Sequence, residues 1–509
     1  MNIADHAANR SDAPALLIGD ERVAYGELHE RAMRVAGLLH EAGLRRGDAV
    51  VLMLTNRREF LEVTWGCQLS GLYYTPVNTH LTYDEVSYIV DDCQARALFI
   101  DESMEQLAFD LRSRDSKVEV WVTVGAEWHG WQSYDAALAA VTSQAELSDG
   151  CEMLYSSGTT GRPKGIRRPL PTENGSWAQG LLEQAALHLY QATSDSIYLS
   201  PAPLYHAAGV NYTMAMHRIG AATVIVPKFD AEETLRLIER RRVTHAQFVP
   251  TMFVRMLKLP KEVRERYDLS SLRWVVHAAA PCPVDVKQQM FEWLGPIIYE
   301  YYGGTEGFAG ATIGPLEWLS HPGSVGKPLT TVHVVGEAGE ELPVGEAGEL
   351  FFEGGPEFTY WGDPEKTKSV SNERGWRSLG DMGYVDEEGY VYLTDRATFM
   401  IVSGGVNIYP QETENLLIMH PKVADAAVFG IPNEEFGEEV KAVVQPLDGI
   451  AHTPELSDEL MEYCRTQLAG YKCPRSIDFD PELPRDPNGK LYKRRIRDRY
   501  WEGRTSRIL

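Results

Sequence analysis

The sequence predicts an α/β protein with a large N-terminal domain of layered sheets and helices, followed by a small α+β C-terminal domain. Three observations predict this fold class. Helical and strand-like segments alternate in the first hundred residues, the pattern changes after residue 395, and a chain of 509 residues is longer than one hydrophobic core requires. We therefore place an N-terminal domain at residues 1–394 and a C-terminal domain at residues 395–509.

The N-terminal segments alternate between helix and strand. Residues 26–43 carry apolar side chains on one helical face, namely Leu28, Ala32, Val35, Ala36 and Leu39. The segments that follow are a strand at 49–54, a helix at 59–69, a strand at 73–77, a helix at 83–92 and a strand at 97–100. Because strands that alternate with helices are joined by crossover connections, this order predicts largely parallel sheets.

The C-terminal segment is richer in strands. The expected elements are strands at 424–430, 440–445 and 476–479 and a helix at 456–468. The length of this segment, roughly 115 residues, is a usual size for one domain. A basic run at residues 490–498 (KLYKRRIRD) predicts a solvated helical face for its basic residues other than Lys490.

The composition excludes several classes of function. A formal net charge of −24 argues against nucleic-acid binding, which needs a basic face, and against strong attachment to anionic lipid. The six cysteines lack CxxC spacing and histidine partners, so neither a zinc site nor a disulfide framework is indicated. No apolar run is long enough to cross a membrane, and the N-terminus does not resemble a secretion signal. We therefore predict a cytoplasmic protein without a transmembrane segment.

The most informative motif is the segment 155–165 (YSSGTTGRPKG), whose composition predicts a phosphate-binding loop. Glycines such as Gly158 let backbone N–H groups approach phosphate oxygens, and the Lys164 ammonium adds positive charge. The hydroxyls that can donate further hydrogen bonds belong to Ser156, Ser157, Thr159 and Thr160. A Walker A loop is excluded because it needs Ser or Thr directly after the lysine, where this chain has Gly165. The alternative, a flexible linker, is disfavoured by the Arg-Pro-Lys within the segment.

The loop resembles the phosphate-binding signature of the adenylate-forming superfamily, which includes acyl-CoA synthetases, luciferases and the adenylation domains of peptide synthetases. Further motifs of this superfamily follow in the expected order, so the resemblance extends over nearly the whole chain. They are 277–283 (HAAAPCP), 301–306 (YYGGTE), 376–384 (WRSLGDMGY), 395–414 (DRATFMIVSGGVNIYPQETE) and 484–493 (PRDPNGKLYK). The resemblance implies an N-terminal domain that binds ATP and the acid, a mobile C-terminal domain, and a requirement for ATP, Mg²⁺ and coenzyme A.

The resemblance assigns nucleotide and metal contacts to the glycine-containing motif YYGGTE. Tyr302 would stack on adenine beside Gly303, and Thr305 would contact phosphate. Glu306 would bind Mg²⁺ together with the Thr160 hydroxyl, and both are predicted catalytic residues. A single carboxylate suits Mg²⁺, whose other ligands are phosphate and water oxygens. The structural alternative is a Thr-Glu pair that only caps a helix.

Two further motifs are implied to hold the nucleoside. Ala279, Ala280 and Pro281 match the small residues that lie against adenine and the acyl group, although tight packing at a strand end explains them equally well. Asp381 and Arg396 match residues that contact the ribose, because a carboxylate accepts hydrogen bonds from two adjacent hydroxyls. A turn aspartate and a surface arginine are the alternatives.

The C-terminal domain is implied to serve both half-reactions. Lys490 resembles the lysine that contacts the substrate carboxylate and the α-phosphate during adenylation. Gly404 and Gly405 match the loop that replaces it when the small domain rotates and that opens a tunnel for the pantetheine arm of CoA. Thr398 occupies the expected hinge position, where the family usually has aspartate or lysine. Lys472 is a candidate CoA contact, with an ordinary surface lysine as the alternative.

The acid is expected to bind beside His206, which matches an aromatic or histidine gate near the substrate carboxylate. We count His206 among the catalytic residues for substrate positioning, without an acid or base role, and a core histidine is the alternative. The implied pocket residues are Tyr205, His206, Val210, Asn211, Met214, Gly303 and Phe308. This mostly apolar set predicts a medium- or long-chain fatty acid, or a bulky alicyclic, steroid-type or aromatic acid.

Together these motifs predict an AMP-forming acyl-CoA synthetase. Such an enzyme forms acyl-AMP from a small-molecule carboxylic acid and ATP with release of pyrophosphate, then transfers the acyl group to CoA with release of AMP. A peptide-synthetase adenylation domain is disfavoured because residues 204–217 contain no Asp or Glu to pair with a substrate ammonium. A stand-alone adenylation enzyme with another acceptor, luciferase-like oxidation and a catalytically silent nucleotide-binding protein stay open. The oligomeric state, a homodimer included, stays open as well.

Replacement of Lys490 tests the enzyme prediction. The Lys490→Ala variant should lose about 100-fold in acid-dependent AMP formation, since a contact that stabilises developing charge contributes on the order of 3 kcal/mol to the transition state. The measurement is AMP released from ATP in the presence of Mg²⁺, acid and CoA. Equal rates for the variant and the unmodified protein would contradict the prediction.

Overall fold

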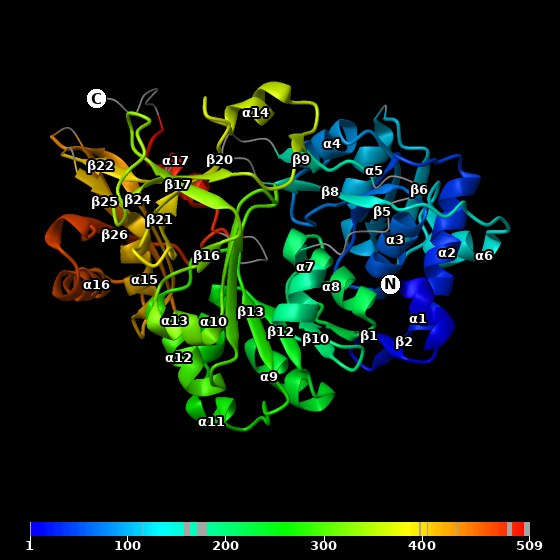
Figure 1. Ribbon diagram of the computed structural model, residues 1–509, viewed down its shortest axis with the longest axis horizontal. Helices are drawn as coiled ribbons and strands as arrows, with labels where there is room; N and C mark the ends of the chain where they lie inside the picture. Colours follow the sequence, from blue (N-terminus) through cyan, green and yellow to red (C-terminus); the bar gives the residue numbers. More distant parts are fainter. Residues whose placement is uncertain are drawn as a thin grey trace.

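The computed structural model describes residues 2–114, 116–156, 163–170, 181–396, 399–404, 406–433, 435–485 and 491–502 (Figure 1). Two large, mostly parallel sheets, a smaller antiparallel sheet and a separate sheet near the C-terminus organise the chain. In Figure 1 the N-terminal segments, in blue, lie at the right and the C-terminal helix α16 (Pro454–Gln467) lies at the left edge. This arrangement confirms the predicted fold class of layered sheets and helices with a small C-terminal unit.

The first large sheet has eight strands among the described residues. In spatial order they are β19 (Thr359–Tyr360), β9 (Lys164–Arg167), β8 (Cys151–Ser156), β4 (Tyr73–Pro76), β3 (Ala49–Met53), β5 (Ala95–Asp101), β6 (Val120–Val124) and β7 (Gln132–Ser133). The strands from β8 to β7 are parallel, whereas β9 pairs antiparallel with both β8 and β19. The strands predicted at 49–54, 73–77 and 97–100 are confirmed as β3, β4 and β5.

The second large sheet lies beside the first. Its described strands, in spatial order, are β16 (Lys327–Pro328), β15 (Gly310–Ile313), β14 (Ile298–Gly303), β13 (Trp274–His277), β12 (His245–Phe248), β10 (Ile197–Ser200), β11 (Ala222–Ile225), β1 (Pro14–Ile18) and β2 (Glu21–Ala24). The strands from β14 to β1 are parallel, and those at the two edges are antiparallel to their neighbours. The carboxyl ends of β13 and β14 therefore meet at one edge, which is where ligands usually bind in such sheets.

The two smaller sheets are antiparallel for the most part. One contains β17 (Thr331–Val335), β18 (Gly348–Glu353), β20 (Arg377–Val385) and β21 (Val391–Arg396). The other contains β23 (Val406–Ile408), β22 (Ile401–Ser403), β25 (Gly437–Pro446), β24 (Val423–Asn433) and β26 (Ser476–Phe479). The last three of these confirm the strands predicted in the C-terminal segment, while the position of the domain boundary stays a prediction.

Helices cover both large sheets. The described α-helices not yet given are α1 (Ile3–Asn9), α2 (Tyr25–Glu41), α3 (Arg58–Leu69), α4 (Tyr83–Asp92), α5 (Glu105–Ser113), α6 (Tyr134–Ala140), α7 (Leu181–Gln184), α8 (Ala207–Ile219), α9 (Ala231–Arg241), α10 (Pro250–Leu257), α11 (Lys261–Arg264), α12 (Val284–Leu294), α13 (Pro315–Ser320), α14 (Pro364–Ser369), α15 (Pro410–Met419) and α17 (Lys493–Asp498). The predicted helices at 26–43, 59–69 and 83–92 are confirmed as α2, α3 and α4, and the apolar face predicted for α2 is buried. No helix among the described residues is both long and apolar enough to cross a bilayer.

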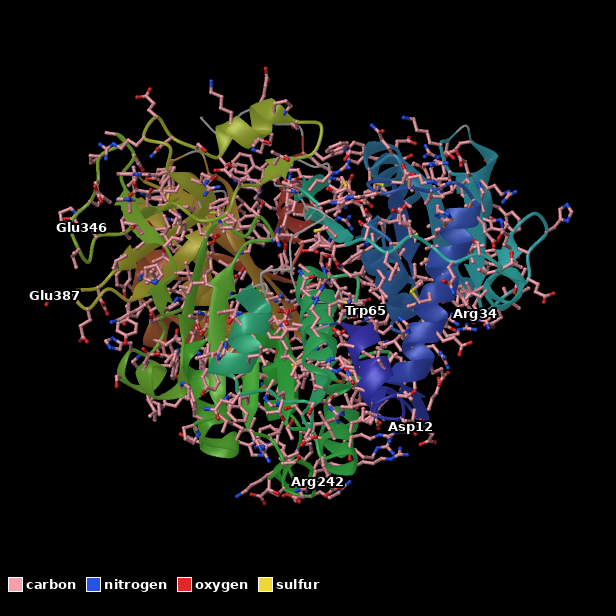
Figure 2. All side chains as sticks on the ribbon, turned by 45° about the vertical axis from the view of Figure 1, so that its right-hand side comes forward. Asp12, Arg34, Trp65, Arg242, Glu346 and Glu387 are labelled. Carbon is pink, nitrogen blue, oxygen red and sulfur yellow. The ribbon has the colours of Figure 1, made fainter. Side chains whose placement is uncertain are left out.

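A buried aromatic contact joins the two large sheets. Trp65 of α3 is fully buried, and its indole Nε1 donates a hydrogen bond to His217 Nδ1 of α8 at 3.0 Å. Figure 2 shows Trp65 inside the molecule, whereas the labelled charged residues Asp12, Arg34, Arg242, Glu346 and Glu387 lie at its periphery. Burial lowers the pKa of His217 to about 3, so the ring is neutral and Nδ1 can accept the indole proton. The helix α8 is thereby fixed between the sheets.

The basic C-terminal run differs from the prediction of a fully solvated helical face. Lys493 of α17 is buried and forms an ion pair with Glu414 of α15 at 2.7 Å, and Ile496 is buried beside it. Arg494 and Arg495 keep about half of their side chains exposed. Only part of the helix therefore faces solvent, because its apolar residue and the methylene stem of Lys493 pack on the C-terminal sheet.

A pair of leucine substitutions tests the packing of the C-terminal unit. Leu460→Ala should destabilise the protein by about 2–4 kcal/mol, because Leu460 of α16 is fully buried and its loss leaves a cavity. Leu316→Ala on α13 is the matched control, since Leu316 is 71% exposed and should change stability by about 0.5 kcal/mol or less. Thermal unfolding followed by circular dichroism measures both, and equal effects would contradict the assigned core.

Candidate active site

The described ends of the predicted phosphate loop lie next to each other. Ser156 at the end of β8 and Lys164 at the start of β9 are opposite partners in an antiparallel pair. The residues between them that we predicted to bind phosphate, Ser157, Gly158, Thr159 and Thr160, lie outside the described residues. The segment that connects the two strands therefore begins and ends at a single point on the edge of the sheet.

A tyrosine that the sequence analysis missed lies between two predicted site residues. The Tyr360 hydroxyl donates a hydrogen bond to Glu306 Oε1 at 2.7 Å, and the Lys164 ammonium lies 5.5 Å from the centre of the Tyr360 ring. Burial and the nearby Lys366 ammonium lower the pKa of Lys164. Tyr360 thus contacts both groups, the Glu306 carboxylate through its hydroxyl and the Lys164 ammonium through its ring.

The Glu306 carboxylate suits the expected Mg²⁺. Among the described residues, no group of three His, Cys, Asp or Glu side chains is arranged to hold a metal ion. Mg²⁺ commonly binds proteins through one or two carboxylates and takes its other ligands from phosphates and water. Because Tyr360 engages only Oε1 of Glu306, the second carboxylate oxygen is compatible with this role.

The predicted adenine and ribose residues come together on one side of β14. The Tyr302 hydroxyl donates a hydrogen bond to Asp381 Oδ2 at 2.7 Å, and Asp381 is the strand partner of Arg396 across β20 and β21. Asp381 is buried, with 7% of its surface exposed. Carboxylates commonly accept hydrogen bonds from ribose hydroxyls, so the proximity of the three residues is compatible with the predicted nucleoside contacts, which stay a prediction.

The small residues after β13 have an unusual backbone. Ala279 has φ +74°, a left-handed conformation that a residue with a Cβ adopts rarely. Ala279 and Pro281 are exposed, and Ala280 is half-buried. Tight packing at a strand end, the alternative considered above, would leave these side chains buried. Strained, exposed backbone next to the end of a parallel strand is typical of ligand sites.

Arg167 and Arg168 follow the phosphate loop and have different surroundings. The Arg167 guanidinium lies between the rings of Tyr73 and Trp361, at 4.1 and 3.9 Å from their centres. The Arg168 guanidinium donates to the Thr305 carbonyl oxygen at 3.4 Å. Arg167 therefore stabilises the sheet through stacking, whereas Arg168 connects β9 to the predicted metal-binding motif.

A tyrosine cluster lies on the other side of β14, against α8. Its members are Tyr190, Tyr198, Tyr212 and Tyr301, and the Tyr212 ring stacks on the other three at 5.9 to 6.4 Å between ring centres. The Gln247 amide connects the hydroxyls of Tyr198 and Tyr301, at 3.2 and 3.0 Å. A small cavity adjoins this cluster, lined by Tyr190, Tyr198, Tyr212, His245, Met216, Val276, Ala186 and Ala246.

The predicted acid-binding residues are divided among several places. His206 precedes the first turn of α8, with its ring 4.7 Å from that of Tyr205. Tyr205, Val210 and Met214 belong to the core between α8 and the first sheet, Phe308 belongs to the core under the smaller antiparallel sheet, Asn211 is half-buried, and Gly303 is exposed at the end of β14. The described residues that line the cavity are others, on the opposite face of α8. The role of the predicted residues in binding the acid stays a prediction.

Charged side chains are buried directly behind the carboxyl ends of β13 and β14. Lys287 Nζ of α12 donates to Glu300 Oε2 at 2.5 Å, and His277 Nε2 lies 3.3 Å from the same oxygen. Burial lowers the pKa of His277, which favours its neutral form, and Lys287 forms the ion pair with Glu300. Burial favours the protonated form of Glu300, but its contacts with His277 and Lys287 outweigh burial and lower its pKa to about 2. Burial raises the pKa of the neighbouring Cys282 thiol, which disfavours its thiolate form.

Few of the C-terminal site residues fall within the described chain. Gly404 lies exposed at the turn between β22 and β23, with φ +57°. Lys472 forms an ion pair with Glu412 at 2.5 Å. Gly405, Thr398 and Lys490 lie outside the described residues, as does the side chain of Arg396. Their predicted roles stay predictions.

Comparison with protein families gives two matches that together span most of the chain. The model described as "AMP-binding enzyme" matches residues 3–358, and the model described as "AMP-binding enzyme C-terminal domain" matches residues 412–490. The first match covers well over half of the sequence. The first match contains the predicted phosphate loop and the motif 301–306, and the second ends at Lys490.

Individual proteins are similar over nearly their whole length. Feruloyl-CoA synthase of an Amycolatopsis species is 35% identical, covering 96% of this chain and 96% of that protein. The fatty acid–acyl-carrier-protein ligase ScoC of Streptomyces coeruleorubidus is 32% identical, covering 97% and 95%. The solved structure of the anthranilate CoA ligase AuaEII in complex with anthranoyl-AMP has a TM-score of 0.84 at 27% identity, covering 98% of this chain and 96% of that chain.

A double substitution tests the buried ion pair. Lys287→Met should destabilise the protein by about 3–5 kcal/mol, because it leaves the Glu300 carboxylate buried without its charged partner. Combining it with Glu300→Leu should restore most of the loss, since an apolar pair needs no counter-charge. The measurement is denaturant unfolding followed by tryptophan fluorescence.

The exposed pair Lys422 and Glu459, at 2.6 Å, provides the control. Lys422→Met should cost about 1 kcal/mol or less, because solvent screens that pair. An effect of Lys287→Met as small as the control, or a double variant worse than the single one, would contradict the assignment.

Proposed function

This chain belongs to the AMP-binding enzyme family and is an AMP-forming acid–thiol ligase of the acyl-CoA synthetase type, and we propose that its acid is an aromatic carboxylic acid. In the first half-reaction, a carboxylate oxygen of the acid attacks the α-phosphorus of ATP and pyrophosphate leaves. In the second, the CoA thiol attacks the acyl carbon and AMP leaves. Both half-reactions bring anionic groups together, so the site must offset negative charge.

We assign the groups that offset this negative charge to residues around β9 and to Lys490. We assign the β- and γ-phosphates to Lys164 and the predicted loop that precedes it, and the metal to Glu306. When bound, Mg²⁺ would neutralise charge on the leaving pyrophosphate. Lys490 is assigned to the α-phosphate and the attacking carboxylate. What supports these roles is the shared ring of Tyr360, which adjoins both Lys164 and Glu306.

The nucleoside is assigned to Tyr302, which belongs to the same motif 301–306 as Glu306, and to Asp381. Tyr302, whose hydroxyl already donates to Asp381, would present its ring to adenine, and Asp381 would accept from the ribose hydroxyls. The exposed backbone at Ala279 would border the adenine. Held in this way, the nucleotide presents its α-phosphate beyond the end of β14, where the carboxylate arrives.

The tyrosine cluster is the observation on which the aromatic substrate rests. It flanks α8, which begins at the predicted carboxylate gate His206, and Tyr301 is part of the same strand as Tyr302. Aromatic rings favour aromatic ligands through offset and edge-to-face contacts. Two similar proteins reported above act, by their names, on ferulate and anthranilate, which are aromatic acids. A bulky alicyclic or steroid-type acid would gain less binding energy from contacts with these tyrosine rings.

A fatty acid is the second candidate. The relative ScoC, 32% identical, is named a ligase for a fatty acid and an acyl carrier protein, so both its acid and its acceptor differ from our proposal. A reducing compartment such as the cytoplasm is proposed for either activity, because all six cysteines are free. The acceptor and the acid must therefore be tested together.

The deciding experiment is AMP formation across a panel of acids with CoA, with a carrier protein, and with neither. We expect aromatic acids to exceed fatty acids of eight to sixteen carbons by about tenfold or more in kcat/KM, since ring contacts contribute about 0.5–1.5 kcal/mol each. High turnover should require CoA. The Lys490→Ala variant is the negative control and gives the background rate of AMP formation. A preference for long-chain acids, or for the carrier protein, would overturn the proposal.

A further inference from the structure

We propose that Tyr360 is a positioning residue for adenylation, which orients the Glu306 carboxylate for Mg²⁺ through its hydroxyl and places Lys164 through its ring. The proposal rests on the roles assigned to Glu306 and Lys164 in the proposed function. It does not depend on which acid the enzyme takes. Tyr360 touches the groups that contact metal and phosphate and is not itself assigned to either ligand.

The backbone around Tyr360 is firmly held. Tyr360 lies on β19, opposite Ile166 of β9, so it is part of the same sheet edge as the phosphate loop. Its backbone N–H donates to the Thr367 hydroxyl at 2.9 Å, and its ring packs edge-on against Phe358 at 5.3 Å. Only 7% of its surface is exposed. The hydroxyl therefore has a fixed position relative to Lys164, the first residue of β9.

The fixed hydroxyl restricts the Glu306 carboxylate. Glu306 follows β14 in a loop, where a glutamate side chain with three rotatable bonds would otherwise occupy many positions. The 2.7 Å hydrogen bond from Tyr360 holds Oε1 and leaves Oε2 for another ligand. Groups that orient a metal-binding side chain in this way typically change metal affinity by about 10–100-fold when they are removed.

The Tyr360 ring acts on a different group. The Lys164 ammonium lies 5.5 Å from its centre, within the range of a cation–π contact. Burial and a second cation, Lys366 of α14, lower the pKa of Lys164, and the two ammonium groups repel each other. The ring thus limits where Lys164 can move under that repulsion. The hydroxyl and the ring can be separated by experiment, because phenylalanine keeps the ring and lacks the hydroxyl.

The first test measures ATP binding by calorimetry in the absence of any acid. Tyr360→Phe should raise the Kd for ATP about tenfold when Mg²⁺ is present and less than twofold in EDTA, because only the metal-dependent part is lost. Tyr267→Phe, which removes a hydroxyl that donates to the Glu232 carboxylate at 2.8 Å and belongs to none of the predicted motifs, should change neither value. An equal loss with and without Mg²⁺, or no loss at all, would overturn the proposal.

A double-variant cycle establishes that the effect acts through Glu306. In a Glu306→Gln background, Tyr360→Phe should cause no further rise in the Kd for Mg²⁺-ATP, whereas independent effects would multiply and contradict the proposal. A melting temperature within a few degrees of the parent protein confirms that each variant is folded. A wrong acid assignment would not affect these measurements, so failure of the proposed substrate and failure of this inference are distinguishable.

The kinetic test separates the two half-reactions. Acid-dependent exchange of pyrophosphate into ATP should fall about tenfold in Tyr360→Phe and recover partly at high Mg²⁺, while thioester formation from a synthetic acyl-adenylate and CoA should be unchanged. A purely structural role would slow both half-reactions together. That result would refute positioning through the metal.

Discussion

Strand β14 is the element on which both halves of the site depend, because successive side chains of a strand point to opposite faces. Tyr301 faces α8 and stacks on Tyr212, while Tyr302 faces the smaller sheet and donates to Asp381. The acid and the nucleotide are therefore assigned to opposite faces of one strand. They can meet only beyond its carboxyl end, where the chain continues into Thr305 and Glu306. A shift of β14 by one residue would exchange the two faces and dismantle both groups at once.

The position of β14 is set by charge as well as by sheet hydrogen bonds. Glu300 lies on the same strand as Tyr302 and pairs with Lys287 of α12, which is fully buried. A buried ion pair contributes little net stability, because removing two charges from water offsets most of their attraction. It does penalise any displacement that separates the charges. The pair therefore fixes the distance between α12, which follows the exposed residues Ala279 and Pro281, and the strand that precedes the metal-binding motif.

How much of the fold and of the site could be predicted from the sequence depends on how far apart the interacting residues lie along the chain. Helix α2 and the strands β3 and β5 were predictable because each has its own periodicity or a continuous apolar run. Tyr360 was not predictable from the residues around it, because its partner Glu306 lies 54 positions away and the contact exists only after β19 has paired with β9.

The prediction of which residues bind the acid is limited for a different reason. Val210 and Met214, which we predict to line the acid pocket, are buried against the first sheet, and Tyr212 and Met216 line a small cavity on the other face of α8, so the pocket assignment stays a prediction. Both sets recur at helical spacing and both are apolar, so neither hydrophobicity nor periodicity distinguishes them. The packing of α8 between the two sheets, fixed in part by Trp65 and its hydrogen bond to α8, decides which of its side chains line that cavity.

Positive and negative side chains lie close together near the predicted phosphate loop of this acidic chain. The net charge is −24, and burial together with the nearby Lys366 ammonium lowers the pKa of Lys164, while Glu306 and Asp363 act in the other direction. A nucleotide phosphate placed between the two ammonium groups would turn their repulsion into attraction to a shared anion. The overall field of the protein disfavours the approach of ATP, so binding depends on these few short-range contacts. The ring of Tyr360 matters in this setting because it restrains Lys164 before the anion arrives, without adding a charge of its own.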